Sequence, residues 1–325
     1  MENKFERRLW GLVLALFFLG SACTARPWHH DAGEYVVVQP GPGESLEKVA
    51  ADFGGGAAGL PAVEALNPPG LTPANTPLLV PTTPAYDLGI RSDGYQTVPV
   101  LTYRWLDGEH SESVEKRLQS DLLQLKSMGA SLLTPEAFLG FIRMERSVSR
   151  GAVLLAFEVT HAEGFRDFLS EAEHTELPGL LFLDPSQVGE AGQLTWEEVV
   201  QLAQGGLEPA LLPAEARGLS APAPKESLVG YTRRVKEAVT SSHKRLVSHT
   251  GQPVRFAAYP DGTGNSVLAS VMVSLGTKGI FVFGEGGNPF FCDNLSIVRM
   301  DAGARGAEEP LDRYLDTFRK ARLAW

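Results

Sequence analysis

The sequence is poor in the residues that most catalytic and redox sites require. Its 325 residues include two cysteines and seven histidines, too few for a disulfide framework or a Cys/His metal cluster. Basic residues are also in deficit, because 29 Lys and Arg stand against 39 Asp and Glu and give a net charge of −10. A chain this acidic lacks the electrostatic footprint of a nucleic-acid-binding protein. Ser-His-Asp arrangements and nucleotide-binding glycine loops are missing as well.

Long apolar runs are scarce. The run at the N-terminus, "LWGLVLALFFLGSA" after the charged "MENKFERR", is too short to cross a bilayer comfortably and is typical of a targeting segment. The small residues that lead into Cys23 ("LGSAC") resemble the lipobox of bacterial lipoproteins, although Gly20 stands where Leu is usual. This resemblance implies removal of the signal peptide, residues 1–22, and a lipid on Cys23. A simple cleaved signal and an uncleaved anchor helix are the alternatives.

A lipid on Cys23 would attach the protein to a membrane of the cell envelope, facing the periplasm. Thr24 after the cysteine favours the outer membrane over the inner one, by resemblance to Gram-negative sorting signals. Cys292 is then left without an intramolecular partner, and its place in "NPFFCDN" predicts a buried apolar thiol. Residues 23–34 form a short polar tether, in which His29 and His30 are expected to lie in solvent.

Residues 35–81 differ in character from their surroundings. "YVVVQPGPGESLEKVAADF" predicts a strand, a turn and a helix capped by Ser45. "LPAVEALN" predicts a second helix that ends before Pro68, and "TPLLVP" predicts a closing strand. This βααβ order, with the "GESL" and "LNP" segments, resembles the LysM module. The resemblance implies binding of peptidoglycan or another N-acetylglucosamine-containing glycan, and a small β-α decoration without a ligand is the alternative. The residues expected at the glycan are Gly43, Glu44, Ser45, Leu46, Asn67 and Pro68.

After a linker over residues 82–97, apolar strand-like runs alternate with amphipathic helical stretches. Such alternation predicts parallel strands that are joined by crossover helices. Seven or eight strand–helix units over residues 98–325 predict an α/β fold in the form of a (β/α) barrel. The predicted strands lie in "VPVLTY", "SLLT", "GAVLLAFE", "GLLFLD", "PALL", "RFAAYP", "GIFVFG" and "LSIVRM".

One of these strands, "GAVLLAFE", ends in Glu158, and the working residues of such barrels lie at the carboxyl ends of strands. Together with "VPVLTYRW", "LLTPEAFLGFI" and the "YPDG" turn, it resembles the polysaccharide deacetylase family, with the segments in the family's order. The resemblance runs from Val98 to Arg299 and implies a distorted (β/α) barrel. Members of that family hydrolyse N-acetyl groups with a metal ion held by an aspartate and two histidines, beside a second aspartate that acts as base.

The family's metal ligands are not present at the matching positions. The base position falls on Glu158, but the ligand positions fall on Val159, Leu212 and Ala216, and Arg104 stands where a histidine is common. Aliphatic side chains offer no lone pair, and a zinc site needs three or four converging ligands. The resemblance therefore predicts a barrel without a metal cofactor, in which Glu158 is a remnant of the catalytic base.

Two alternatives stay open at this site. His161 with Glu163 or Asp167 would rebuild a zinc site, and the protein would then be an active or divergent deacetylase of a cell-wall glycan or exopolysaccharide. Otherwise the polar groups at the barrel mouth either bind a glycan or satisfy one another, for example as an Arg104–Glu158 ion pair. The groups expected at the mouth are Tyr103, Arg104, Glu158, Tyr259, Asp261 and Arg299.

The function that the sequence favours is therefore a lipid-anchored envelope protein that binds peptidoglycan or a related glycan through residues 35–81. The barrel would add a second, non-catalytic surface. A structural role in an envelope complex, suggested by the acidic composition alone, is a third possibility.

Overall fold

The computed structural model describes most of the chain, with several gaps. Cys23, Pro68, Ala216 and Asp261 lie outside the described residues, as does the predicted signal peptide. The chain divides into two units, Met1–Ala85 and Tyr86–Trp325. Within the described part, no helix is long and apolar enough to cross a membrane. The described residues are 27–33, 35–53, 63–64, 66–67, 76–81, 89–91, 94–106, 111–149, 151–171, 177–213, 218–259, 262–304 and 311–321.

The first unit is a small antiparallel sheet with helical turns between two of its strands. Valines on one face of the sheet, with Val49 and Ala50 of the helix, form its core. The Lys48 amide donates to the Ser45 hydroxyl at 3.3 Å, which is the expected N-cap. The first strand lies in the predicted tether, and its residues are exposed. The elements are β1 (His29–Asp31), β2 (Tyr35–Val38), α2 (Leu46–Phe53) and β3 (Leu78–Pro81), in the sheet order β1-β2-β3.

Asn67 joins the second helical turn of this unit to β3. Its amide nitrogen donates to the carbonyls of Val63 and Leu79, at 2.7 Å each, and its amide oxygen accepts from the Leu79 amide at 2.9 Å. The side chain is buried. Asn67 therefore stabilises the unit from within, and its expected contact with a glycan stays a prediction.

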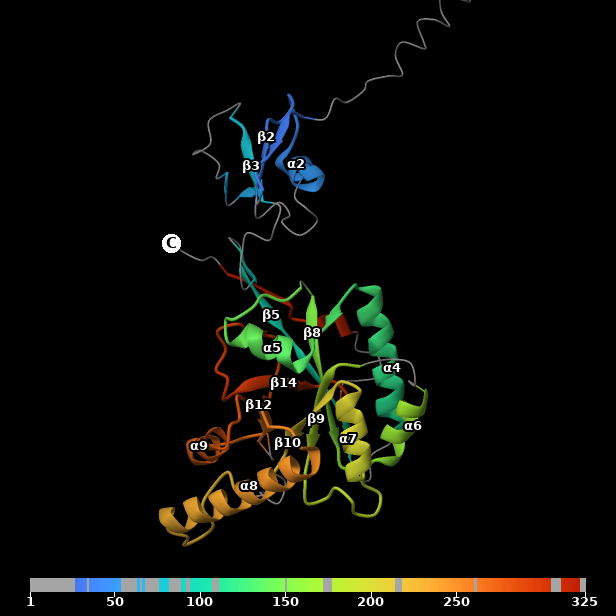
Figure 1. The fold of residues 1–325 in the computed structure, drawn as a ribbon, viewed down its shortest axis with the longest axis vertical. Helices are drawn as coiled ribbons and strands as arrows, with labels where there is room; N and C mark the ends of the chain where they lie inside the picture. The colour runs from blue at the N-terminus through green and yellow to red at the C-terminus, as the bar shows by residue number, and fades with distance from the viewer. Residues whose placement is uncertain are drawn as a thin grey trace, which may run out of the picture. The chain divides into compact units, whose positions relative to one another are not determined.

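The second unit contains a closed ring of seven parallel strands, as predicted (Figure 1). Each strand pairs with the next around the ring, and the ring closes where β6 pairs with β8. The eighth predicted strand, β7 (Ser131–Leu132), pairs only with the start of β8. In spatial order the ring consists of β6 (Val100–Trp105), β14 (Ile297–Asp301), β12 (Gly279–Phe283), β11 (Phe256–Ala258), β10 (Leu207–Leu211), β9 (Gly179–Leu183) and β8 (Ala152–Val159).

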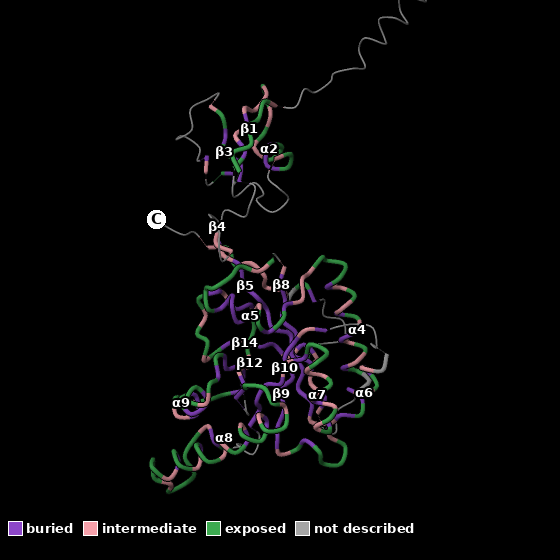
Figure 2. Tube along the Cα trace, in the orientation of Figure 1, coloured by how far each residue is buried: buried purple, intermediate pink, exposed green. Residues whose placement is uncertain are grey.

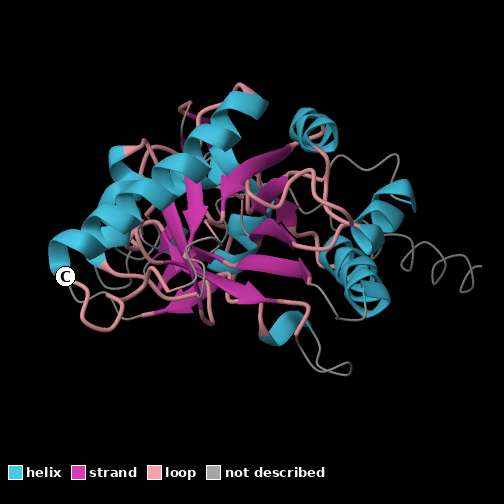
Figure 3. Cartoon of the chain, turned by 90° about the horizontal axis from the view of Figure 1, so that it is seen from below, coloured by secondary structure: helices cyan, strands magenta, loops and turns pink. Residues whose placement is uncertain are grey.

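Helices surround the ring on its outside (Figure 3). Local signals set where they begin: Thr195 and Glu198 form a capping box at α7, and Asn265 caps α9. A further helix, α5 (Pro135–Ile142), packs its apolar residues into the core inside the ring. The outer helices are α4 (Ser111–Ser127), α6 (Glu163–Glu171), α7 (Trp196–Gln204), α8 (Leu228–Thr250) and α9 (Ser266–Ser274).

A second small sheet forms partly from residues that the sequence analysis assigned to the linker over 82–97. Its central strand pairs with strands far away in the sequence, which local sequence patterns do not reveal. A short 3₁₀ helix, η3 (Leu311–Arg313), precedes the last strand. The strands are β4 (Ile90–Arg91), β5 (Gly94–Val98), β13 (Asn288–Pro289) and β15 (Phe318–Lys320).

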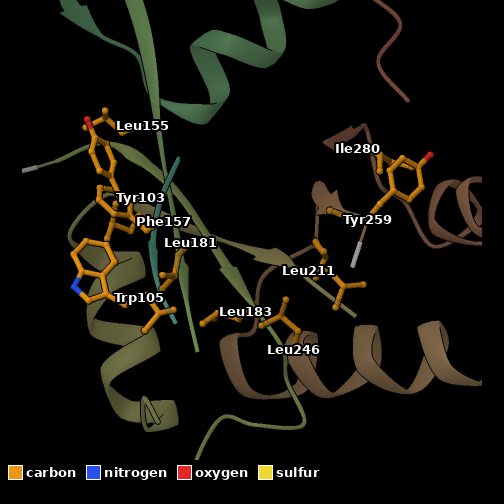
Figure 4. Packing of buried hydrophobic residues seen from close by; sticks show 14 of the residues in the cluster. Tyr103, Trp105, Leu155, Phe157, Leu181, Leu183, Leu211, Leu246, Tyr259 and Ile280 are labelled. Carbon is orange, nitrogen blue, oxygen red and sulfur yellow. The ribbon is translucent and has the colours of Figure 1, made fainter. Parts of the chain in front are cut away.

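Side chains alternate along the strands and divide the core of this unit in two. One cluster joins strand residues such as Tyr103, Phe157 and Tyr259 to residues of the outer helices, and so fills the layer between ring and helices. Figure 4 shows Tyr103, Phe157 and Trp105 grouped within this layer. The other cluster takes the alternate strand residues and α5, and fills the interior of the ring. The ring is accordingly buried on both faces (Figure 2).

We predict that Asn67→Asp unfolds the first unit and leaves the second unit folded. The substitution removes two donated hydrogen bonds and places a charge beside two carbonyl oxygens, at a cost of about 2 kcal/mol or more. Hydrogen–deuterium exchange should speed up across residues 35–81 and stay unchanged in the ring strands. The matched control is Asn294→Asp, whose amide makes one exposed bond of 3.2 Å, and which should change little. Slow exchange retained in β2 and β3 of the Asn67 variant would contradict the account.

Candidate functional site

Charged side chains form one layer inside the ring, near the carboxyl ends of its strands. Arg104 of β6 is directly in register with Glu158 of β8, and Glu158 with Phe182 of β9. Across the ring, Phe283 of β12 is in register with Arg299 of β14. The contacts among these side chains show that all five point inward. Two arginines and one carboxylate thus meet where the sequence analysis expected the remnant active site.

Both carboxylate oxygens of Glu158 accept hydrogen bonds from arginine. Oε1 accepts from Arg104 Nε at 3.2 Å and from Arg104 Nη2 at 3.0 Å, while Oε2 accepts from Arg299 Nη1 at 2.8 Å. Glu158 is only 4% exposed. Charge-assisted bonds of this kind are the stronger hydrogen bonds of proteins, and they fix the position of the carboxylate. The ion pair that the sequence analysis left open as an alternative is present, and it has a second arginine.

Arg299 is fully buried and stacks between two aromatic rings. Its guanidinium carbon lies 4.0 Å from the centre of the Phe283 ring and 4.7 Å from that of Phe182. Burial lowers the pKa of Arg299, and the charge of Glu158 opposes this shift. Arginine nonetheless stays protonated in proteins. Among the described residues, Nε and Nη2 of Arg299 have no hydrogen-bond partner, so the ring faces and Glu158 provide its stabilisation.

Arg104 links this layer to the surface of the barrel mouth. Its Nη1 donates to Asp301 at 3.1 Å, and its side chain and that of Asp301 are each about a quarter exposed. Burial works to lower the pKa of Arg104, but Glu158 and Asp301 outweigh it and raise the pKa. A groove of about 360 Å³ opens beside the pair. Its lining consists of Arg104, Phe283, Gly284, Glu285, Met300, Asp301, Ala304 and Tyr314.

Of the positions matched to the family's metal ligands, the structure describes Val159 and Leu212, and neither side chain can bind a metal ion. Val159 points outward, because it follows inward-facing Glu158 on the strand, and it packs in the layer under the helices. Leu212 belongs to the apolar interior cluster. Glu158 has both oxygens bound to arginine. These residues do not fit a divalent ion, since they offer one carboxylate, already neutralised, in place of three or four ligands.

His161 lies apart from the charged layer. Its Nε2 is 3.6 Å from a Glu163 oxygen, and its ring lies next to Gly192 of the loop after β9. Nowhere in the described ranges do three His, Cys, Asp or Glu side chains gather as a metal site would need. The rebuilt zinc site therefore has no set of ligands among the residues that the structure describes.

Tyr103 and Tyr259 are not at the mouth, contrary to the sequence analysis. The Tyr103 hydroxyl donates to Asp121 of α4 at 2.8 Å, and the Tyr259 hydroxyl donates to the Leu295 carbonyl at 3.1 Å. Both rings are buried outside the ring of strands, and Figure 4 shows Tyr259 beside Ile280. The physical reason is strand alternation, because a residue next to inward-facing Arg104 or Ala258 has to point outward.

Asp301 belongs to the charged layer and the sequence analysis missed it. It follows Arg299 by two residues on β14, so the period of two places both side chains on the same face. That spacing was the available signal. Phe182 and Phe283, which stack on Arg299, resemble ordinary core residues in the sequence, and nothing local distinguishes them.

In the first unit, the "GESL" turn is partly exposed, as a binding loop would be. Gly43 has φ of 77°, a left-handed conformation that favours glycine. Glu44 accepts from the Gly41 amide at 2.9 Å and from Lys48 at 2.7 Å, so its carboxylate is held within the turn. Ser45 caps the helix. These residues position the turn, and their expected contact with a glycan stays a prediction.

The comparisons with known proteins identify the fold. No protein-family model matches the sequence, and no curated protein matches it. A de-N-acetylase from Aggregatibacter actinomycetemcomitans superposes with a TM-score of 0.54 at 18% identity over 64% of this chain and 96% of that one. The BpsB deacetylase domain from Bordetella bronchiseptica superposes with a TM-score of 0.52 at 16% identity, over 64% of this chain and 98% of that one. IcaB from Ammonifex degensii superposes with a TM-score of 0.50 at 20% identity, over 64% of this chain and 92% of that one. The barrel therefore has the polysaccharide deacetylase fold.

We predict that Glu158→Gln lowers the free energy of unfolding by about 3–5 kcal/mol, because it leaves the buried charge of Arg299 without a counter-ion. Asp301→Asn, which removes the charge of a partly exposed partner of Arg104, should cost about 1 kcal/mol or less. Urea unfolding followed by tryptophan fluorescence measures both.

The rescue variant combines Glu158→Leu with Arg299→Met and removes both buried charges at similar volume. It should recover much of the loss, since apolar replacements of buried ion pairs are often well tolerated. Equal losses for Glu158→Gln and Asp301→Asn would show that the buried pair does not hold the ring together.

Proposed function

We propose that the protein is a glycan-binding protein of the cell envelope, whose deacetylase-like barrel does not hydrolyse N-acetyl groups. The observation that carries the second half is the bonding of Glu158. A general base has to reach its substrate, but Glu158 is only 4% exposed and both of its oxygens accept hydrogen bonds from guanidinium groups.

The charge of the layer also disfavours a metal ion. A dication beside Glu158 would meet two guanidinium charges that already neutralise this carboxylate, and Val159 and Leu212 supply no further ligand. Without a metal ion to lower the pKa of water, Glu158 alone would offer a base contribution of about 10²–10⁴-fold at best. That is far less than amide hydrolysis requires.

The groove at the barrel mouth retains features that suit a sugar. It combines the ring of Phe283 with Tyr314 and with the polar pair Arg104 and Asp301. Aromatic faces pack against the apolar faces of sugar rings, and charged groups bond to their hydroxyls. We assign this groove the role of a second, weaker glycan contact.

The stronger contact would be the first unit, as a LysM-like module for peptidoglycan or a related N-acetylglucosamine-containing glycan. The strands β2 and β3 pair antiparallel and enclose helical turns, and the "GESL" turn is exposed. The same proposal includes a lipid on Cys23 and an outer-membrane location facing the periplasm, which rest on the sequence around Cys23. The lipid would hold the two units near the cell wall.

Sedimentation with insoluble peptidoglycan tests the assignment of the two units. We expect residues 24–85 to sediment with peptidoglycan and residues 86–325 to do so weakly, at least tenfold less at equal concentration. The Asn67→Asp chain should lose binding because its first unit unfolds. If residues 86–325 sediment strongly and residues 24–85 do not, the main glycan site lies in the barrel.

Acetate release tests the inactivity of the barrel. With N-acetylglucosamine oligomers or peptidoglycan and added zinc, we expect no acetate above the level of the buffer, for the wild-type chain and for Glu158→Ala alike. The expected equality follows from a carboxylate that is engaged by two arginines. Acetate released by the wild-type chain and abolished in Glu158→Ala would identify an active deacetylase.

A further inference from the structure

Helix α8 carries a basic surface on an otherwise acidic chain. Its 23 residues include five Lys and Arg against one acidic residue, Glu237, whereas the whole chain has a net charge of −10. Arg234 is neutralised by Glu226, with Nη2 and Oε2 at 2.7 Å. The remaining four basic residues are exposed: Arg233, Lys236, Lys244 and Arg245.

The geometry of α8 directs these charges away from the barrel. Its buried residues recur every three or four positions, at Tyr231, Val235 and Val239, and pack against the ring. Lys236 and Lys244 lie three and eleven residues after Arg233, which places the three on one side of a helix with 3.6 residues per turn. Arg245 flanks them. None of the four has an ion-pair partner among the described residues.

Two large apolar residues are exposed at the start of the helix, and of these Val229 lies on the basic side, whereas Leu228, seven residues before Val235, lies on the side of the buried residues. Leu228 is 68% exposed and Val229 is 70% exposed. They form the first turn of α8, directly after the N-cap Ser227. By the same helical spacing, Val229 lies on the side of Arg233 and Lys236. The helix is about 35 Å long and runs along the outside of the barrel (Figures 1 and 3).

We infer that this face of α8 docks on an anionic phospholipid membrane. Basic side chains beside exposed apolar ones are the pattern of helices that lie at a lipid surface, where the charges meet headgroups and the apolar chains enter the acyl boundary. The remainder of the chain is acidic and is repelled by such a surface, so α8 would be the side that turns toward it. An acidic polymer would use the charges but would leave Val229 exposed.

This inference goes beyond the proposed glycan binding and does not depend on Glu158 or on the first unit. A lipid on Cys23 would keep the chain near a membrane, but it would not determine which side of the barrel faces the lipid. Docking of α8 would fix that orientation and direct the rest of the protein away from the surface.

Photocrosslinking of the full chain tests the inference. Ser241→benzoylphenylalanine places the probe on the exposed side of α8, and Ser120→benzoylphenylalanine places a matched probe on α4. Both chains are irradiated with vesicles of phosphatidylglycerol or of phosphatidylcholine, at low and at high salt. We expect lipid crosslinks from position 241 with phosphatidylglycerol at low salt, and at least tenfold fewer with phosphatidylcholine, at high salt, or from position 120.

The charge variant carries Arg233→Gln, Lys236→Gln and Lys244→Gln together. It should give at least tenfold fewer lipid crosslinks from position 241, since each basic charge near an anionic surface strengthens membrane binding about fivefold. The control variant Lys126→Gln, Lys278→Gln, Lys320→Gln removes the same charge from other exposed sites and should crosslink as the parent does. Thermal melting confirms that both variants fold.

Crosslinks from position 241 that are equal with both lipids, or equal in the two variants, would overturn the inference. The inference would also fail if position 241 crosslinked to dextran sulfate and to no lipid. That result would assign the face to an acidic polymer.

Discussion

The carboxylate of Glu158 joins three strands of the barrel through two guanidinium groups, and the remainder of the interior is arranged around it. Arg104 reaches Glu158 from β6 and Arg299 reaches it from β14, so β6, β8 and β14 are connected at one level of the ring. Arg299 is fully buried, and a buried charge persists only where its counter-charge is held in place. Glu158 contacts only Nη1 of the Arg299 guanidinium. The rings of Phe182 and Phe283 cover the two faces of this group. Removing the carboxylate would leave two cations in an apolar interior.

The same interaction supports the proposal that this barrel does not carry out the chemistry of the deacetylases whose fold it shares. Metal-dependent hydrolysis needs a cation with an open position and a carboxylate that is free to accept a proton. Here the positive charge is supplied by side chains, and the carboxylate bonds to them through both oxygens. Two arginines balance two acids, Glu158 and Asp301, within the layer. In the function that we propose, the barrel contributes a polar groove at its mouth, and the first unit and α8 provide separate surfaces.

The strands were predictable from sequence because each is buried on both faces and appears as a short apolar run. The facing of side chains was also predictable, although family resemblance alone obscured it: with Arg104 inward, Tyr103 has to point outward, and Asp301 has to share the interior. The Arg104–Glu158 ion pair was one alternative that the sequence offered, but the sequence could not decide for it, because the pairing depends on the register of two strands whose paired residues are 54 positions apart. Residues 94–97 were assigned to a linker because their partners β13 and β15 lie near the other end of the chain.

The central claim is that guanidinium groups occupy the charged layer in place of a metal ion. Anomalous diffraction at the zinc edge, from crystals grown with excess zinc, tests it most directly. The account predicts no anomalous peak within coordination distance of Glu158, and density for the guanidinium groups of Arg104 and Arg299 on its two oxygens. A zinc peak bound by Glu158 and at least two further side chains, with the arginines displaced, would contradict it.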